Sequence, residues 1–332
     1  MRRIALPLTV LLLTLLHSSS AFGWLNTGHR IIADVAWAEL SPPERTWVSE
    51  ILKQHPRYQD DLLLDKPDGT SDAETLRYAF VTAATWPDMV RSQSNPMHAG
   101  FSHPAWHYID IPYCLGSQPP PARPASNRPG PQNIVEALVK GCADINDPKI
   151  SAPDKAVAMC WILHLCGDIH QPLHCCDMYS PQFPNGDQGG NLFILLRDPP
   201  YADSRTNLHF VWDSMPGDFQ SRDLEDYMAA GLRSEPRYSR EKLKNLLAGT
   251  DFQAWAEESH ALAIKYAYAN GELRGVAKGA PLPEATVIPG LTHHYMREAE
   301  HITDQQLILA GYRTADVLKK LFTESTQQAR AK

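Results

Sequence analysis

The fold is decided by the stretch His164-Leu165-Cys166-Gly167-Asp168-Ile169-His170-Gln171-Pro172-Leu173-His174. It closes a segment, residues 156–166, that is apolar on nearly every side, as in a helix buried among other helices. Upstream, Ser151-x-x-Asp154 has the spacing of a helix start, and the proline ends the helical pattern near Gln171. The sequence therefore predicts a central helix from about residue 151 to residue 171.

Within this helix, His164 and Asp168 are four residues apart and share one face. Both side chains need partners, because an unpaired charge in such an apolar segment is costly. A histidine–aspartate hydrogen bond inside the core would satisfy a single pair. However, His209 and Asp213 repeat the spacing, and His174 follows the helix end, where the chain can turn back toward the same cavity. Imidazole and carboxylate groups without thiolates suit zinc, so the repeat favours metal ligation.

The first 23 residues have the pattern of a secretory signal peptide. The basic pair Arg2-Arg3 precedes an apolar run, Ala5–Leu16, that is too short to span a membrane, and Ala21-Phe22-Gly23 fits a cleavage site. The alternative is a retained anchor helix, but no stop-transfer pattern follows. Cleavage after Gly23 would make Trp24 the first residue of a secreted or periplasmic protein. Its free α-amine would be a nitrogen ligand that only a chain terminus offers.

The 332-residue chain is acidic, with a formal net charge of −7. An acidic surface repels nucleic acids at long range, so such a substrate would require concentrated positive charge at the site itself. No stretch after the signal peptide is apolar enough to cross a bilayer, so we expect no integral membrane association. Nothing in the sequence implies a stable protein partner, and we expect a monomer.

Six cysteines, an even number, permit disulfide bonds in an exported chain, although their pairing cannot be read from the sequence. Cys160 and Cys166 lie in the apolar helix, where buried free thiols are the alternative. No Cys-x-x-Cys pair occurs, which argues against a thiolate zinc finger.

Most of the remaining chain also has helical patterning, which predicts a mainly α fold with a few short strands. We expect one domain over residues 24–323, followed by a polar tail at 324–332. Besides the central helix, helices are expected near residues 28–40, 42–54, 72–85, 133–144, 221–232, 251–269 and 292–322.

Short strands are predicted only at Trp106–Ile111 and Asn191–Leu196. The proline-rich residues 112–131 are predicted to form a surface excursion, since proline continues neither a helix nor a central strand. A domain linker is the alternative, but candidate ligands lie on both sides of it. Residues 177–190, which are rich in Gly, Pro and Asn, are predicted to form a loop.

Six short motifs occur in the order Trp24-x4-His29, Trp86-Pro87-Asp88-x2-Arg91, His107-Tyr108-Ile109-Asp110, His164-x3-Asp168-Ile169-His170-Gln171-Pro172-Leu173-His174, Asp187-x-Gly189-Gly190-Asn191 and His209-x3-Asp213. Each motif alone is weak, whereas the ordered set is specific. Together they resemble the zinc-dependent single-strand nucleases of fungi and plants, such as mung bean nuclease, which are related to bacterial zinc phospholipase C. The resemblance runs from Trp24 to Asp213 and continues weakly through Ala310-Gly311-Tyr312-Arg313.

The resemblance implies three zinc ions per chain in a mostly helical domain. One ion would be held by Asp88, His107, His164 and Asp168. Its neighbour would be held by the amine and carbonyl of Trp24, by His29 and by the other oxygen of Asp168. The third would be held by His174, His209 and Asp213. An α-amine has a pKa of about 7.7–8, so a metal ion can displace its proton near neutral pH.

Four further residues take roles under the resemblance. Arg91 would be catalytic by binding the phosphate, and the alternative is an ordinary surface arginine. Asp110 would be catalytic by orienting the nucleophilic water or Arg91, and otherwise a structural carboxylate. Tyr108 would stack on a base, although alternation along the predicted strand could instead bury it. Asn191 would hydrogen-bond a base edge from the Gly-Gly-Asn turn.

The implied activity is hydrolysis of single-stranded DNA and RNA to 5′-phosphate products by a zinc-bound hydroxide, together with 3′-nucleotidase activity. Zinc phospholipase C is the close alternative, with the same metals acting on phospholipid head groups, but Arg91 and Asp110 favour nucleic acid. A non-catalytic zinc-binding protein is the alternative of another class. Ser214 stands where several members of the family carry asparagine, so base preference stays open.

Overall fold

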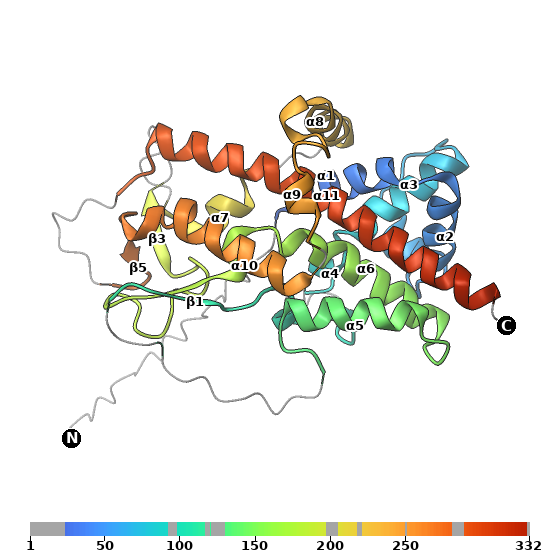
Figure 1. The fold of residues 1–332 in the computed structure, drawn as a ribbon, viewed down its shortest axis with the longest axis horizontal. Coiled ribbons are helices and arrows are strands. Elements are labelled where there is room, and N and C mark those ends of the chain that lie inside the picture. The colour runs from blue at the N-terminus through green and yellow to red at the C-terminus, as the bar shows by residue number, and fades with distance from the viewer. Residues whose placement is uncertain are drawn as a thin grey trace, which may run out of the picture.

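The computed structural model describes residues 24–91, 98–116, 120, 130–196, 205–217, 221–249, 251–280 and 289–330. The predicted signal peptide, residues 1–23, lies outside these ranges. The described chain is mainly helical with a few short strands, which confirms the predicted fold class (Figure 1). Over the described residues, no helix combines the length and apolar character needed to cross a lipid bilayer.

Most helices lie close to their predicted ranges, and short helices that the sequence did not predict join them. The α-helices are α1 (Asn26–Glu39), α2 (Pro42–Leu52), α3 (Asp72–Ala83), α4 (Trp86–Met89), α5 (Ile134–Asn146), α6 (Ala152–Asp168), α7 (Leu208–Asp213), α8 (Arg222–Ser234), α9 (Lys244–Leu247), α10 (Phe252–Leu262) and α11 (His293–Arg330). The strands are β1 (Pro112–Cys114), β2 (Asp177–Tyr179), β3 (Phe193–Leu196), β4 (Arg205–Asn207) and β5 (Val276–Ala277).

Helix α6 lies at the centre of the fold and contacts α5, α11 and α2. The side chain of Ser151 accepts a hydrogen bond from the backbone nitrogen of Asp154 and so caps the first turn, as the sequence predicted. Every residue from 159 to 179 is buried, which includes the second half of α6 and the turns that follow it. The polar members of this run therefore require partners inside the protein.

The end of α6 comes at Asp168, earlier than the predicted end near Gln171. The backbone nitrogens of His170 and Gln171 bond back three residues, to the carbonyls of Gly167 and Asp168, at 3.0 Å each. Bonds of this kind join residues three positions apart, whereas the bonds of an α-helix join residues four positions apart. They therefore tighten the last turn of the helix. A 3₁₀ turn, Pro172–Cys175, then carries His174 back toward the helix.

Helix α11 runs along most of the molecule in Figure 1 and packs extensively on α1. The two helices approach closely at Gly311, where an added Cβ would lie 2.4 Å from Cγ1 of Val35. The helix was predicted to end near residue 322 but continues to Arg330. Residues 324–330 of the expected polar tail contain neither glycine nor proline, and they are helical.

The predicted strand at Trp106–Ile111 is wrong, because Pro104 starts a 3₁₀ turn that ends at His107. After this turn, the chain first forms a strand at β1, which pairs in parallel with β2. The other predicted strand is confirmed in β3, which lies antiparallel to β4 and β5.

The two predicted irregular segments are more structured than expected where they are described. The excursion predicted at 112–131 begins with β1, and its residues 117–119 and 121–129 lie outside the described ranges. The loop predicted at 177–190 begins with β2 and carries two buried carboxylates, Asp177 and Asp187. Parallel pairing of β1 with β2 therefore joins the two segments.

The cysteines form no disulfide bond, although an exported chain would permit them. All six positions are described, and all six are free thiols. Cys160 and Cys166 are buried in α6, as the free-thiol alternative anticipated. The neighbours Cys175 and Cys176 belong to two different apolar clusters.

Candidate metal centre

The first predicted ligand set meets in space at the C-terminal half of α6. His107 Nδ1 lies 2.9 Å from Asp168 Oδ2 and 3.0 Å from His164 Nε2. His164 Nε2 lies 3.0 Å from the same oxygen of Asp168. Asp88 Oδ1 lies 3.8 Å from the ring nitrogens of both histidines. Four side chains from α4, the 104–107 turn and α6 thus aim one atom each at a common point.

The separations between these four atoms fit a tetrahedral ion. In a tetrahedral zinc site with bonds of about 2.0–2.1 Å, the ligand atoms lie about 3.3–3.4 Å apart. The five observed separations run from 2.9 to 3.8 Å and bracket that value. All four side chains are buried, so their polar atoms require partners inside the protein.

The second predicted set adjoins the first through Asp168. His29 Nε2 lies 3.3 Å from Asp168 Oδ1, the oxygen that the first set does not use. Among the described residues, neither ring nitrogen of His29 nor this oxygen has a hydrogen-bond partner. Buried polar atoms are rarely left without partners, so the chemistry of these atoms fits ligation of a metal ion. The position needs Gly167, since a Cβ there would lie 2.8 Å from His29 Nδ1.

Trp24, the predicted terminal ligand, lies fully buried beside this second set. Its indole Nε1 donates to the carbonyl of Gly167 at 3.2 Å. The next residue, Leu25, donates its backbone nitrogen to the carbonyl of Asp213 at 3.1 Å. The start of the described chain is therefore held between two segments that carry ligands.

The third predicted set also comes together. One ligand atom each from His174, His209 and Asp213 lies within 4.8 Å of the others. His209 Nε2 is 3.4 Å from Asp213 Oδ2, and His174 Nε2 is 3.9 Å from Asp213 Oδ1. His174 also lies 3.9 Å from Asp168, so the third set is next to the other two.

Three of the histidines are oriented by backbone carbonyls. The Nδ1 atoms of His164, His174 and His209 each lie 2.7 Å from a carbonyl oxygen, those of Ala84, His107 and Gly189 respectively. A carbonyl only accepts hydrogen bonds, so each Nδ1 must donate a proton. In the neutral form of each ring, Nε2 then has a lone pair that faces the cluster, an arrangement typical of metal-ligating histidines.

Burial and neighbouring charges shift the pKa values of the predicted ligands in different directions. Burial lowers the pKa of His29, and it lowers the pKa of His107 to about 4, so both rings are neutral at pH 7. Burial alone would raise the pKa of Asp168. The charges of His164 and His174 and the hydrogen bond from His107 outweigh burial and hold that pKa well below its usual value. The charges of Asp168 and Asp88, in contrast, outweigh burial and raise the pKa of His164, and burial raises the pKa of Asp213 well above its usual value. Metal binding would release the protons of such groups, because the ligands must be deprotonated.

A cavity of about 600 Å³ opens onto the first and third sets. The four predicted catalytic and substrate-binding residues, Arg91, Asp110, Tyr108 and Asn191, all line it, together with His107, His174 and His209. Its volume is within the range of small-molecule sites in proteins. Its remaining walls include Pro104, Leu173, Asp177, Asn185, Gln188 and Gly189.

Arg91 is not an ordinary surface arginine. Its side chain is only 10% exposed, and Nη1 lies 3.4 Å from Asp88 Oδ1, the oxygen that faces the first set. Tyr108 is 39% exposed, so the alternative that strand alternation buries it is wrong. Asn191 is nearly buried and donates its side-chain nitrogen to the carbonyl of Gln188 at 2.9 Å.

A family model of S1/P1 nucleases matches residues 24–323. The chain belongs to the S1/P1 nuclease family. Endonuclease 3 of Arabidopsis thaliana is 30% identical over 188 residues, which are 52% of this chain and 54% of that protein. Nuclease S1 of Aspergillus oryzae is 25% identical over 205 residues, 60% of this chain and 57% of that protein.

A longer match reaches Endonuclease 2 of A. thaliana, which is 23% identical over 319 residues, 90% of this chain and 91% of that protein. The chain spans about half the length of the four other Arabidopsis relatives that it matches. These relatives agree with the family that the ordered motifs indicated.

The structure of this S1/P1 nuclease family member adds a residue that the sequence analysis did not single out. Gln171 is fully buried and donates Nε2 to Asp213 Oδ1 at 2.6 Å. Its Oε1 accepts a hydrogen bond from the backbone nitrogen of Leu173, also at 2.6 Å, which fixes the orientation of the amide. The signal in the sequence was the position of this polar residue between Asp168 and His174, at the end of a helix that was predicted to be buried.

Asp187 was not among the predicted site residues either. It does not line the cavity but supports residues that do. Asp187 is fully buried, and its carboxylate accepts hydrogen bonds from Tyr268 and from the backbone nitrogen of Met178. It thereby holds the turn that carries Gly189 and Asn191. Gly189 has a φ of +60° and no room for a Cβ, which would lie 2.5 Å from the carbonyl of Leu173.

Proposed function

We propose that this protein is a secreted phosphodiesterase with three zinc ions, which hydrolyses single-stranded DNA and RNA to 5′-phosphate products and removes 3′-phosphate from nucleotides. One observation carries the proposal: the first and third ligand sets open onto a cavity that Arg91 and Asp110 also line. A metal cluster beside a buried arginine suits hydrolysis of an anionic ester better than storage of metal.

Zinc fits the donor atoms, which are imidazole nitrogens and carboxylate oxygens without a cysteine. The ion assignments follow the three sets, with Asp168 shared between the first two and the Trp24 amine and carbonyl completing the second. Bound zinc would supply an activated water and neutralise charge on the phosphate. The orphaned atoms of His29 and Asp168 support occupancy of the second position.

Charge also favours an anionic substrate at this position. Three divalent cations outweigh the ligand carboxylates of Asp88, Asp168 and Asp213, which leaves a local positive surplus. The net charge of the whole chain is −7, so attraction acts only at short range. Salt screens charges beyond about 10 Å, and the surplus can therefore prevail inside the cavity.

The residues that line the cavity would bind the phosphate, orient the attacking water and contact the bases. Arg91 donates hydrogen bonds to the non-bridging phosphate oxygens and stabilises the charge that develops in the transition state. Asp110 orients the attacking water or Arg91. Tyr108 offers a partly exposed ring on which an unpaired base stacks, and Asn191 presents an amide to the base edge. Bases in a duplex are hidden from such contacts, which favours single strands.

Export completes the site under this proposal. Cleavage after Gly23 would free the amine of Trp24, a residue whose indole donates a hydrogen bond to Gly167, the neighbour of Asp168 in the chain. We infer a periplasmic or extracellular monomer that requires no stable protein partner. A leader retained on Trp24 would remove one ligand and place extra chain in a buried position.

The activity test compares substrates with the correctly processed protein. We expect hydrolysis of single-stranded DNA and RNA, much slower hydrolysis of duplex DNA, no release of head groups from phosphatidylcholine, and loss of activity with a chelator. Restoration by zinc would support the metal assignment. Preferential cleavage of phosphatidylcholine would contradict the proposed substrate, and absence of any hydrolysis would favour a non-catalytic zinc protein.

A further inference from the structure

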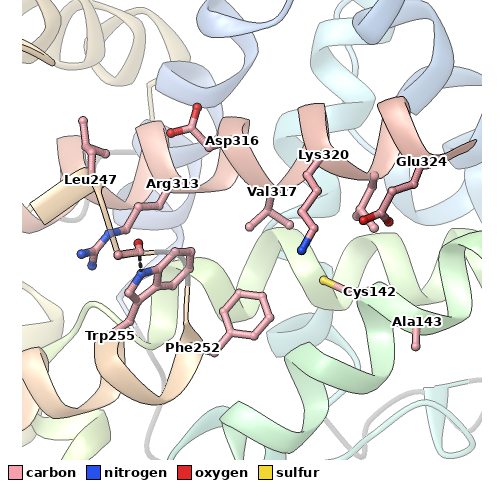
Figure 2. Close-up of a pocket in the computed structure, with 12 residues that line it drawn as sticks. Cys142, Ala143, Leu247, Phe252, Trp255, Arg313, Asp316, Val317, Lys320 and Glu324 are labelled. Atoms are coloured by element: carbon pink, nitrogen blue, oxygen red, sulfur yellow. Dashed lines mark hydrogen bonds between the residues drawn. The ribbon is translucent and has the colours of Figure 1, made fainter. Parts of the chain in front are cut away.

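Two of the cavities in the structure differ in what they offer a ligand. The cavity between α5, α10 and α11, of about 330 Å³, has a mainly apolar lining that includes Phe252 and Val317 (Figure 2). Lys320 and Glu324 both line it, so its charges favour neither an anion nor a cation. The cavity at the metal centre also has lining residues without an assigned role, and one of them is the exposed residue Gln188. Gln188 therefore lies where a substrate would bind.

Gln188 has an unusual backbone conformation. Three successive residues, Gln188, Gly189 and Gly190, have φ angles of +55°, +60° and +84°. Glycine adopts such angles readily because it has no Cβ, whereas a residue with a long side chain seldom does. Glutamine thus stands at a position where glycine or asparagine would be the ordinary choice. Such an outlier beside a ligand cavity points to a role for the side chain.

Two buried side chains hold this backbone in place. The backbone nitrogen of Gln188 donates to Asp177 Oδ1 at 2.8 Å. Its carbonyl accepts hydrogen bonds from the backbone nitrogen of Asn191 at 3.2 Å and from the side-chain nitrogen of the same residue at 2.9 Å. Asp177 in turn donates its own backbone nitrogen to the carbonyl of Ile111 at 3.0 Å, in the segment that follows Tyr108. Gln188 is therefore fixed relative to the residues that would contact a base.

The side chain of Gln188, unlike its backbone, is available to a ligand. Within the described ranges, its amide forms no hydrogen bond with the rest of the protein. Asn191, in contrast, is nearly buried, and part of its amide is already used to hold the carbonyl of Gln188. Gln188 therefore offers the cavity a complete amide, with an NH₂ group that donates and an oxygen that accepts.

We propose that Gln188 is a specificity-determining residue, which pairs with the edge of the base in the cavity and favours adenine. This inference rests on the proposed nuclease function. A glutamine amide pairs with a base by accepting from an amino group and donating to the ring acceptor beside it. Adenine alone has an amino group with a ring acceptor on each side, N1 and N7. The amino groups of guanine and cytosine have a ring acceptor on one side only, and thymine and uracil have no amino group.

The test compares variants of the processed, zinc-loaded protein on the four DNA dinucleotides that contain two identical bases. We expect the original protein to prefer the adenine dinucleotide. Gln188→Gly keeps the positive φ and removes only the side chain, so it should raise KM for this substrate about tenfold. Because the base edge takes no part in the chemical step, kcat should not change. Zinc content should not change either.

A second variant and two controls separate reading of the base from other effects. Gln188→Met keeps the length of the side chain but not its hydrogen bonds, and should lose the preference for adenine to the same extent. Gln182→Gly makes the glycine change at an exposed glutamine of the same loop that does not line the cavity, and should keep the preference. Bis(4-nitrophenyl) phosphate, a diester without a base, should be hydrolysed equally by all four proteins. Thermal unfolding checks that each variant folds.

Retention of the original base preference by Gln188→Gly or Gln188→Met would overturn the inference and leave the nuclease function standing. An equal loss for all four dinucleotides would also overturn it, because the side chain would then not distinguish the bases. A preference of the original protein for another base would refute the assignment of adenine. If the zinc-loaded protein hydrolyses none of the dinucleotides, the proposed function itself fails, and the inference fails with it.

Discussion

The indole nitrogen of Trp24 lies 3.2 Å from the carbonyl oxygen of Gly167, to which it donates a hydrogen bond. Gly167 immediately precedes Asp168, whose carboxylate faces both His29 and the first ligand set. The contact therefore places the start of the folded chain beside the carboxylate that joins two predicted metal positions. A residue far from α6 in sequence is thereby brought next to the predicted site.

Gln171 should position Asp213 in the third set. Gln171→Ala removes the hydrogen bond to Asp213 Oδ1 and leaves that buried carboxylate free to turn. Loss of such an orienting partner typically weakens metal binding about 10–100-fold. We expect easier loss of one zinc ion in a chelator titration. Gln171→Glu tests the same contact by replacing the donor with an acceptor. A chelator titration identical to that of the original protein in both variants would exclude this role.

Arg91 should act in the transition state and not in metal binding. We expect Arg91→Ala to lower kcat about 10²–10³-fold, as for loss of one donor to a developing oxyanion, with zinc content unchanged. Arg91→Lys keeps the charge but not the fork of donors, and should retain part of the activity. Steady-state kinetics beside zinc analysis checks both. Unchanged kcat in Arg91→Ala would refute the catalytic role.

Tyr108 should contribute stacking to substrate binding. Base stacking on an aromatic ring is worth about 1–3 kcal/mol per base, so Tyr108→Ala should raise KM for single-stranded DNA roughly 5–150-fold. Tyr108→Phe preserves the ring and serves as the control, with KM close to that of the original protein. If both variants lose the same affinity, the hydroxyl and not the ring would be the important group.

Asp34 should make stability depend on pH at a position away from the cluster. Burial, followed by its hydrogen bond with Asp226, raises the pKa of Asp34 to about 7, although Arg77 at 2.6 Å opposes the shift. The folded protein then binds a proton that the unfolded chain loses near pH 4. Stability from this group is therefore present below pH 4 and lost as pH rises from 4 through 7, by on the order of 4 kcal/mol.

Asp34→Asn provides the check, because asparagine cannot ionise. The difference in unfolding free energy between this variant and the original protein should shift in favour of the variant as pH rises from 4 to 8. Comparing the two at each pH cancels the contribution of metal loss. A constant difference across this range would show that Asp34 is ionised throughout.

The ordered motifs were sufficient to predict which ligand side chains meet, because their spacing fixes helix faces and the resemblance supplies the grouping. His164 and Asp168 share a face by helical periodicity alone. The 3₁₀ turn at Pro104–His107 was mistaken for a strand, because Trp106 and His107 continue into an apolar run that resembles one. Local propensity cannot show that Pro104 starts a turn that packs against the cluster.

Other features depend on contacts between distant segments and leave little trace in the sequence. The hydrogen bond from Gln171 to Asp213 spans 42 residues, and the contact from Trp24 to Gly167 spans 143. The strand β2 within the predicted loop forms because β1 supplies a pairing edge. Cys114 is exposed, and Cys175 and Cys176 lie in two different apolar clusters, positions that the count of cysteines alone cannot reveal.

The most direct test of the central claim is zinc analysis of active protein whose first residue has been sequenced. We predict about three zinc ions per chain when the chain begins at Trp24. A matched protein that retains one or two residues before Trp24 should hold about two, because the terminal amine is lost. Three zinc ions in the extended protein would contradict ligation by the amine. A count near one in the correctly processed protein would contradict the three-ion cluster itself.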